Sequence, residues 1–264
     1  MVTKTDFLIE REKPLAGPSA NLAPSDQKRD WAKGLLPTDS NQYVHYGCLF
    51  CAPDTWTNFD ASPTLRFERL PLIGRLYTKN GQRFPANVRY GNIVRGLPVR
   101  ADSCRGLYCS HVLEHLSLND CRRALRNSFA YLEPRGVFRL VLPDLEVLAR
   151  TYLADGTSGA SHGFMRQSML GFEERNRGLR GLVYSWLGNS HHLWMWDYKS
   201  LEHELKQAGF RNVRRAAFGD AQDPRFCDVE DKGRFDGCLA IESTRQRQFQ
   251  EDPESTSART RRDR

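Results

Sequence analysis

The stretch of sequence that decides the fold is residues 110–142, SHVLEHLSLNDCRRALRNSFAYLEPRGVFRLVL. A capping box at Ser117 and Asp120 begins a helical pattern, in which apolar residues recur at helical spacing: Cys121, Ala124, Leu125, Phe129 and Leu132. The proline and glycine of residues 133–136 end this pattern, and the apolar run 137–142 then predicts a buried strand. Another apolar run, 106–110, lies directly before the helix. Strand, helix and strand in this order predict two parallel strands joined by a crossover helix.

The same alternation extends outward in both directions along the chain. Short strands are expected at residues 43–46, 55–59 and 87–90 before this unit, and at 213–218 and 237–243 after it. A second helix is expected to begin at Asp197 and to end at Gly209, with one apolar stripe: Leu201, Leu205 and Ala208. We therefore predict an α/β fold in which helices cover both faces of a parallel sheet.

Composition divides the chain into three parts. Residues 1–40 are rich in proline and polar side chains, and we expect an extended or partly disordered arm there. Residues 245–264 are rich in arginine, glutamine and serine, and we expect a disordered basic tail. The remaining residues, 41–244, then form one domain of ordinary size.

Composition also excludes several classes of protein. No apolar run reaches the roughly 18 residues that a membrane helix needs, and the N-terminal residues do not form a secretory signal. We therefore expect a cytoplasmic protein whose seven cysteines are reduced. The net charge of +7 is not gathered into a basic patch interleaved with aromatic residues, so neither nucleic acid nor a membrane is an expected partner.

Ligands of a parallel sheet bind at the carboxyl ends of its strands. The residues at those ends are Gly47 and Cys48, Asp60, Asn92, Ser110 and His111, and Pro143 and Asp144. A glycine lets a ligand approach the backbone, and a carboxylate offers two acceptor oxygens to the two hydroxyls of a ribose. An amide at the next strand end suits the edge of a purine. Together these residue types indicate a ligand that contains adenosine.

Five segments of the chain resemble the class I S-adenosylmethionine-dependent methyltransferases, in particular the small bacterial branch with a methyltransferase type 11 domain. The segments are VHYGC (44–48), WTNFD (56–60), YGNI (90–93), SHVLEHL (110–116) and LEPRG (132–136). The resemblance extends from about residue 43 to about residue 243. It implies a Rossmann-like seven-stranded mixed sheet with a C-terminal antiparallel strand pair, and S-adenosyl-L-methionine as the cofactor. It also implies that an insertion at about residues 150–198 covers the substrate.

The resemblance also implies roles for the residues at the strand ends. Gly47 and Cys48, next to Tyr46, would line the methionine part of the cofactor, and Asp60 would hold its ribose. Asn92 and Ile93 would flank the adenine, while Ser110 and His111 would face the sulfonium and the acceptor.

Two residues depart from the family pattern. Leu49 replaces the second glycine of the usual Gly-x-Gly loop, and it brings a side chain to a place where the backbone should approach the cofactor. Asn92 stands where the family usually has an acid, although an amide still pairs with an adenine edge.

Residues 186–197, WLGNSHHLWMWD, hold three tryptophans and two histidines. One interpretation makes this segment the wall of an acceptor pocket, to which we assign His191, Trp194, Trp196 and, from the end of the fifth strand, Asp144. A histidine is then the expected catalytic base, and the candidates are His111, His115 and His192. The other interpretation is a small hydrophobic cluster, in which Asp197 only caps the next helix.

No metal site is assigned, although one motif has the spacing of metal ligands. His111, Glu114 and His115 fit the H-x-x-E-H pattern of an inverted zinc-protease motif, for which Glu173 or Glu174 is available as a third ligand. The motif follows a strand directly, so we expect His111 at a strand end and not inside a helix. A capping or packing role is the simpler interpretation of His115.

Four cysteines form a second pattern of this kind. Cys48 and Cys51 have the spacing of a zinc or redox site, with Cys104 and Cys109 as a loosely spaced partner pair. Buried thiols are common in protein cores, and we expect that role for them here.

The expected function is methyl transfer from S-adenosylmethionine to an oxygen or nitrogen atom of a small-molecule or glycan acceptor. Two alternatives stay open. A domain of this fold that no longer methylates would be a scaffold or regulatory protein, with the acidic loop 219–235 as its partner surface. A protein that keeps the cofactor but changes the reaction would, for example, cyclise the amino-acid part of the cofactor.

Overall fold

The computed structural model describes residues 42–71, 74, 81–174 and 191–246, all of which belong to one compact unit. The expected N-terminal arm (1–40) and nearly all of the expected basic tail (245–264) lie outside the described residues. Residues 175–190 of the expected substrate cover, which include Trp186, also lie outside them.

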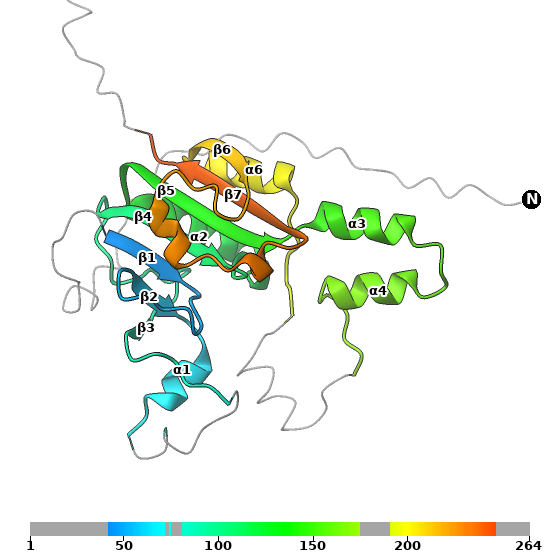
Figure 1. Cartoon of the computed structure of the whole chain (residues 1–264), viewed down its shortest axis with the longest axis horizontal. Helices are drawn as coiled ribbons and strands as arrows, with labels where there is room; N and C mark the ends of the chain where they lie inside the picture. Colours follow the sequence, from blue (N-terminus) through cyan, green and yellow to red (C-terminus); the bar gives the residue numbers. More distant parts are fainter. Residues whose placement is uncertain (1–41, 72–73, 75–80, 175–190, 247–264) are drawn as a thin grey trace, which may run out of the picture. The chain divides into compact units, whose positions relative to one another are not determined.

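Seven strands form one mixed sheet in the order β3-β2-β1-β4-β5-β7-β6 (Figure 1). The strands are β1 Gln42–Tyr46, β2 Thr57–Asp60, β3 Val88–Tyr90, β4 Cys104–Ser110, β5 Leu132–Pro143, β6 Arg211–Ala216 and β7 Cys238–Thr244. Strands β1 to β5 pair in parallel, whereas β7 is antiparallel to both β5 and β6. This arrangement confirms the predicted mixed sheet and its C-terminal antiparallel pair. The strand order reverses between β1 and β4, which is where a ligand of such a sheet binds.

The described α-helices are α1 Pro63–Glu68, α2 Leu118–Tyr131, α3 Leu145–Ala154, α4 Ala160–Gln167 and α6 Tyr198–Gln207. Three short 3-10 helices, η3 Leu113–His115, η4 Pro224–Asp228 and η5 Lys232–Arg234, complete the set. None of the helices in these described segments is long and apolar enough to cross a membrane. Helices α3 and α4 contact each other, and Figure 1 shows them as an adjacent pair.

The two predicted helix starts are confirmed by their caps. The Ser117 hydroxyl accepts a hydrogen bond from the backbone of Asp120 at the start of α2. Asp197 and Ser200 form a capping box at the start of α6, in which each side chain bonds to the other residue's backbone N–H. Gly209 ends the region of α6 with a φ of +108°, a conformation that glycine adopts without strain.

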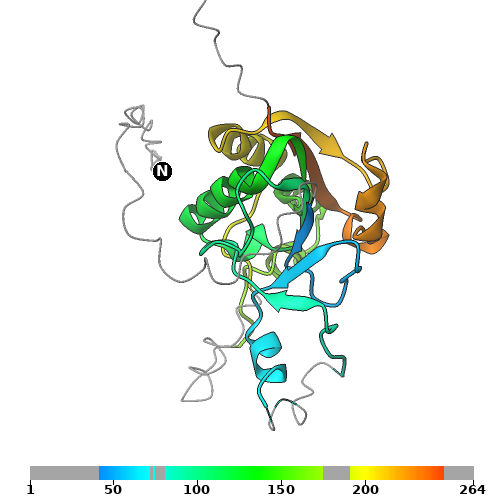
Figure 2. The ribbon, with the colours of Figure 1, turned by 90° about the vertical axis from the view of Figure 1, so that its left-hand side faces the viewer.

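One face of the sheet packs against α2 and α6. The main core lies here, where Leu107, Leu140 and Ile241 of the sheet meet Leu125 of α2 and Leu201 of α6. These residues recur at the predicted spacings, so burial of the apolar stripes positions both helices. Figure 2 shows α2 and α6 on one side of the sheet and the turns η4 and η5 on the other.

The opposite face also carries helices, but in the described residues these are the short 3-10 helices η4 and η5 where a crossover α-helix was expected (Figure 2). In the described residues this face is covered by the β6–β7 connection, where Phe226 of η4 packs on Trp56 and Tyr108. The reason lies in the β1–β2 connection, residues 47–56, which is shorter than the dozen or more residues that a helical crossover usually takes. Without a helix from that connection, a long loop from the other end of the chain fills the space.

Strand β5 also begins earlier than predicted. Leu132 already pairs with Cys104, and the register shifts before Gly106 pairs with Val137. Residues 133–136 therefore form an irregularity inside a long strand and not a separate turn. Arg135, at the tip of that irregularity, has a φ of +75° and donates its backbone N–H to the carbonyl of Arg245.

Candidate active site

The carboxyl ends of β1 and β2 are joined by backbone hydrogen bonds. The N–H groups of Gly47 and Cys48 donate to the carbonyl of Phe59, at 2.8 and 3.2 Å. Because β2, β1 and β4 are neighbours, the strand-end residues predicted for the cofactor lie along one edge of the sheet.

The loop after β1 needs glycine at position 47. Gly47 has a φ of +70°, and a Cβ placed there would lie 2.2 Å from Cγ2 of Val112. Leu49, two residues on, has a φ of +47° and an exposed fraction of 39%. The backbone thus keeps left-handed conformations at both positions where the family pattern has glycine, and the Leu49 side chain reaches the surface. Cys48 is buried, which raises the pKa of its thiol.

Asp60 holds this loop in place. Its Oδ2 accepts the N–H of Leu49 at 3.0 Å and its Oδ1 accepts the N–H of Ser62 at 2.7 Å. The side chain is 4% exposed, and burial raises the pKa of the carboxyl against the two backbone donors, which lower it. Each carboxylate oxygen has a second lone pair. The Asp60 carboxylate can therefore accept one further hydrogen bond at each oxygen, which fits the two hydroxyl donors of a ribose.

The other residues predicted for the cofactor contribute more backbone than side chain. Asn92 turns its Oδ1 to the N–H groups of Val94 and Arg95, at 2.9 and 3.3 Å, which leaves its amino group for another acceptor. The Ile93 side chain packs in the main core. Tyr46 is also in the core, with its hydroxyl 3.1 Å from Oγ of Ser128.

Ser110 and His111 at the end of β4 contact the β6–β7 connection. Nη1 of Arg234 donates to the carbonyl and to the hydroxyl oxygen of Ser110, at 3.2 and 3.3 Å. His111 has a φ of +55°, its Nδ1 lies 3.1 Å from Oε1 of Glu114, and its Nε2 lies 3.3 Å from the carbonyl oxygen of Arg234. Burial by itself would lower the pKa of His111, but hydrogen bonds to Cys238 and Glu114 raise it to about 10. In this arrangement His111 is a proton donor.

His115 and His192, the other two predicted catalytic histidines, lie together. Their ring centroids are 4.9 Å apart, although 76 residues separate them in the chain. Nδ1 of His115 is 3.2 Å from the carbonyl oxygen of His191, and Nδ1 of His192 is 2.8 Å from that of Ser168. Burial lowers the pKa of His192, so this imidazole is neutral near pH 7.

Glu114 completes this group. Its signal in the sequence is the H-x-x-E-H motif alone. One ligand-type atom from each of Glu114, His115 and His192 lies within 4.8 Å of the others. The motif itself is not formed as an inverted zinc-protease site, because η3 has only three residues and His111 lies before it with a left-handed backbone. The spacing signalled Glu114 and His115, but nothing in the sequence linked them to His192.

Three of the four residues predicted for acceptor binding lie close together: Asp144 forms a β-bridge with Trp196, and the ring centroids of Trp194 and Trp196 are 6.2 Å apart. Trp196 is 1% exposed and lies in the main core, so it is not the wall of an open pocket. Asp144 caps α3 by accepting the N–H of Glu146 at 2.9 Å, and it pairs with Arg215 at 3.4 Å. Both residues therefore also contribute to the fold: Trp196 packs in the core and Asp144 caps α3.

The other two predicted acceptor residues are accessible. Trp194 is an exposed side chain, and His191 stacks on the exposed ring of Phe172 with centroids 3.7 Å apart. Nδ1 of His191 lies 3.1 Å from the carbonyl oxygen of Met169, which ties this segment to the end of α4. These aromatic side chains lie next to the His115–His192 pair.

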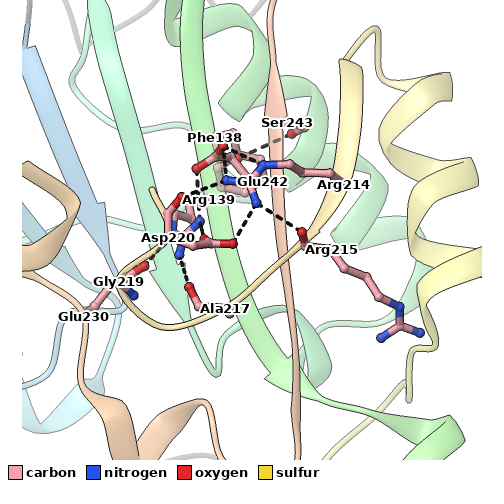
Figure 3. Close-up of polar contacts among 10 residues, drawn as sticks. All are labelled: Phe138, Arg139, Arg214, Arg215, Ala217, Gly219, Asp220, Glu230, Glu242 and Ser243. Atoms are coloured by element: carbon pink, nitrogen blue, oxygen red, sulfur yellow. Dashed lines mark hydrogen bonds and ion pairs between the residues drawn. The ribbon is translucent and has the colours of Figure 1, made fainter. Parts of the chain in front are cut away.

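The acidic loop 219–235 is anchored to the sheet by two of its acids, Asp220 and Glu230. Arg139 of β5 is 0% exposed and makes ion pairs with Glu230, with Glu242 at 3.0 Å and with Asp220 at 2.8 Å (Figure 3). Arg214 of β6 also bonds to Glu242 and Asp220. Asp220 and Glu230 therefore neutralise arginines of the sheet, whereas Asp228 and Asp231 of the same loop are exposed.

The four cysteines with metal-like spacing do not converge. Cys48 packs beside Leu65, Cys51 is exposed, and Cys104 and Cys109 are buried in the main core. All seven cysteines lie in the described residues and all are free thiols. The core role expected for the buried ones is therefore confirmed.

Comparison with known proteins identifies this type of domain. The family model described as a methyltransferase domain matches residues 45–215. No curated protein matches the chain.

Several solved structures are similar to the chain. An S-adenosylmethionine-dependent methyltransferase of Thermotoga maritima is 18% identical over 81% of this chain and 86% of its own, with a TM-score of 0.40. One from Archaeoglobus fulgidus is 13% identical over 79% and 87%, with a TM-score of 0.41. Phosphoethanolamine N-methyltransferase 2 of Haemonchus contortus, solved with S-adenosylmethionine, is 9% identical over 82% of this chain and 51% of its own, with a TM-score of 0.40.

Proposed function

The chain belongs to the methyltransferase-domain family as a class I enzyme with S-adenosylmethionine as its cofactor, and on that premise we propose that it methylates an oxygen or nitrogen atom of a small-molecule or glycan acceptor. We assign this activity to a domain of residues 41–244, with residues 150–198 as its substrate cover. The cytoplasm, where the seven free thiols stay reduced, is the proposed location.

The observation that carries the proposal is the register of polar groups at one edge of the sheet. Asp60 ends β2, the left-handed loop 47–49 ends β1, and Ser110 and His111 end β4. These strands are adjacent, and the strand order reverses between β1 and β4. This edge is where parallel sheets bind nucleotide-like ligands.

Each residue at this edge contacts a different part of the cofactor in our proposal. Asp60 accepts from the ribose hydroxyls with the lone pairs that Leu49 and Ser62 leave free. The backbone of residues 47–49 lines the amino-acid part of the cofactor, and the amino group of Asn92 donates a hydrogen bond to the adenine. Bound there, the cofactor supplies a methyl group on a positively charged sulfur.

The acceptor side of the site is proposed at the end of β4. The exposed aromatic rings of Phe172 and Trp194 offer a surface on which a ring or sugar stacks. The neighbouring imidazoles of His115 and His192 deprotonate or polarise the attacking group, and His111 donates a hydrogen bond beside them.

The experiment that tests this function is calorimetric titration of the protein with S-adenosylmethionine and with its demethylated product. We expect Asp60→Asn to weaken binding by about 10- to 100-fold, because hydrogen bonds to a charged group are worth about 1.5–3 kcal/mol. Asp102→Asn is the matched control, since Asp102 precedes β4 at the opposite edge of the sheet. Equal affinity of the two variants would overturn the role of Asp60.

A second measurement separates methyl transfer from the other reactions of the cofactor. Mass spectrometry of the cofactor after incubation without any acceptor detects a cyclised amino-acid part if the protein performs an intramolecular displacement. Intact cofactor, together with loss of its methyl group when phenol, amine or glycan acceptors are added, supports the proposal.

A further inference from the structure

We propose that Glu114, His115 and His192 form a binding site for a divalent transition-metal ion, of which Zn²⁺ is the best match. The three residues come from η3 and from the segment before α6, and their ligand-type atoms all lie within 4.8 Å of one another. Among the described histidines, cysteines and acids, this is the group of three that the structure brings to ligand spacing. Metal binding at this site does not depend on the proposed methyl transfer.

Both imidazoles are oriented as metal ligands usually are. Nδ1 of His115 lies 3.2 Å from the carbonyl oxygen of His191, and Nδ1 of His192 lies 2.8 Å from the carbonyl oxygen of Ser168. A carbonyl can only accept, so each Nδ1 carries the proton and donates it. The tautomer of each ring is thereby fixed, and Nε2 keeps a lone pair. Metal-ligating histidines are typically held in this way by a backbone carbonyl.

Glu114 supplies the negative charge that such a site needs. Its side chain is 1% exposed, and among the described residues neither carboxylate oxygen accepts a hydrogen bond of good geometry. The nearest cation is the imidazole of His111, with Nδ1 3.1 Å from Oε1. Buried charges are paired or coordinate a metal, and His111 pairs with Oε1 alone, so a metal ion bound at Oε2 would complete the partners of this carboxylate.

The backbone holds the segments that carry the ligands together. The N–H groups of Leu193 and Trp194 both donate to the carbonyl of Glu114, at 2.7 and 3.2 Å. The N–H of His192 donates to the carbonyl of Met169 at 3.3 Å. In a tetrahedral site with ligand bonds of about 2.1 Å, the ligand atoms are about 3.4 Å apart, so side-chain adjustments of roughly 1 Å close the site.

The ligand set selects the type of metal. Two imidazoles and one carboxylate suit Zn²⁺ and its neighbours in the first transition row, whereas Mg²⁺ and Ca²⁺ prefer oxygen ligands throughout. Three protein ligands also leave a fourth position open, as in catalytic zinc sites. If the proposed methyl transfer holds, an acceptor oxygen or nitrogen that fills this position would be polarised by the metal, so that His115 and His192 would act on the acceptor through the metal that they hold.

The test measures metal binding by the full chain, without a histidine tag and without cofactor or acceptor. After treatment with a chelator, the protein is loaded with Zn²⁺, passed through a desalting column and analysed for bound metal. We expect one Zn²⁺ per chain, no retention of Mg²⁺, and the visible absorption of a tetrahedral site when Co²⁺ is used. Zn²⁺ retention by the wild type no greater than that of the variants below would overturn the site.

Glu114→Gln and His115→Ala are the test variants, and His203→Ala is the matched control, because His203 is an exposed histidine on α6. Loss of an outer partner of a metal ligand already costs about 10–100-fold in affinity, so we expect the test variants to lose at least about 100-fold. Circular dichroism checks that each variant is folded. If Glu114→Gln does not fold, the affinity of His115→Ala is the deciding measurement, because His115 is only partly buried. Unchanged affinity in a folded variant would contradict the proposal. Because no methyl transfer is measured, failure of the proposed function leaves this result intact.

Discussion

The backbone N–H of Leu49 donates to Oδ2 of Asp60 at 3.0 Å, and this bond ties the end of β1 to the end of β2. Leu49 reaches that position with a φ of +47°, in a region that glycine normally occupies. The altered first loop therefore keeps the backbone conformation of a glycine-rich loop. The hydrogen bond from Leu49 to the Asp60 carboxylate offsets part of the strain at Leu49.

Replacing Leu49 by glycine tests this strain. A left-handed conformation costs an ordinary residue about 1–2 kcal/mol, and glycine adopts it freely. We expect Leu49→Gly to leave the free energy of unfolding unchanged or to raise it by up to about 1 kcal/mol, measured by urea denaturation. The control is Leu153→Gly on α3, an exposed position with helical backbone, which should lose about 1 kcal/mol. Equal losses at both positions would show that Leu49 is not strained.

Gly47 is constrained by space as well as by conformation. An added Cβ would lie 2.2 Å from Cγ2 of Val112, so we expect Gly47→Ala to destabilise the protein by clearly more than the 1–2 kcal/mol of the backbone strain alone. Gly219→Ala measures that strain by itself, because Gly219 has a φ of +76° and no atom near its Cβ position. Val112→Ala in the Gly47→Ala background should recover the difference, as measured by thermal unfolding. No recovery would assign the loss to strain and not to the clash.

Arg139 is the centre of a buried charge network. Its removal by Arg139→Met leaves the buried charge of Glu230 without a cation and leaves Glu242 with Arg214 alone, and we expect a loss of about 3–5 kcal/mol in the free energy of unfolding. Arg214→Met is the control, because Arg214 bonds to Glu242 from a partly exposed position and should cost about 1 kcal/mol or less. Losses of the same size in the two variants would contradict a special role for the buried guanidinium.

His45 makes stability depend on pH. Burial between Trp56 and Tyr108 lowers the pKa of His45 to about 3, whereas the unfolded chain has a value near 6.5. Between these values the unfolded state binds the extra proton, so stability is lost as pH falls from about 6.5 to about 3, by at most about 1.4 kcal/mol for each pH unit. We expect His45→Phe to reduce this slope in urea denaturation series at several pH values. An unchanged slope would assign the acid sensitivity to other groups.

Much of the fold was predictable because its signals are local. The caps at Ser117 and Asp197 act within three residues, and the apolar stripes of α2 and α6 repeat every turn, so neighbouring side chains carry the information. The ends of the strands were predictable for the same reason. The predicted bounds of all seven strands agree with the observed ones to within a few residues, except at the start of β5. There a register shift between β4 and β5 extends the strand, which no local pattern signals.

The sheet, its main helices and the strand ends that we propose for the cofactor were predictable from the sequence, since each depends on residues close together in the chain. Three features appear only in the folded chain: Trp196 is a core residue, Arg139 pairs with Asp220 and Glu230 of the 219–235 loop, and His192 lies beside Glu114 and His115. These groups are 70 to 100 residues apart or enclosed by distant segments. Their burial and contacts depend on how distant segments, such as α4, η3 and the β6–β7 connection, pack on the sheet. Contacts between residues so far apart in the chain produce no periodic pattern in the sequence.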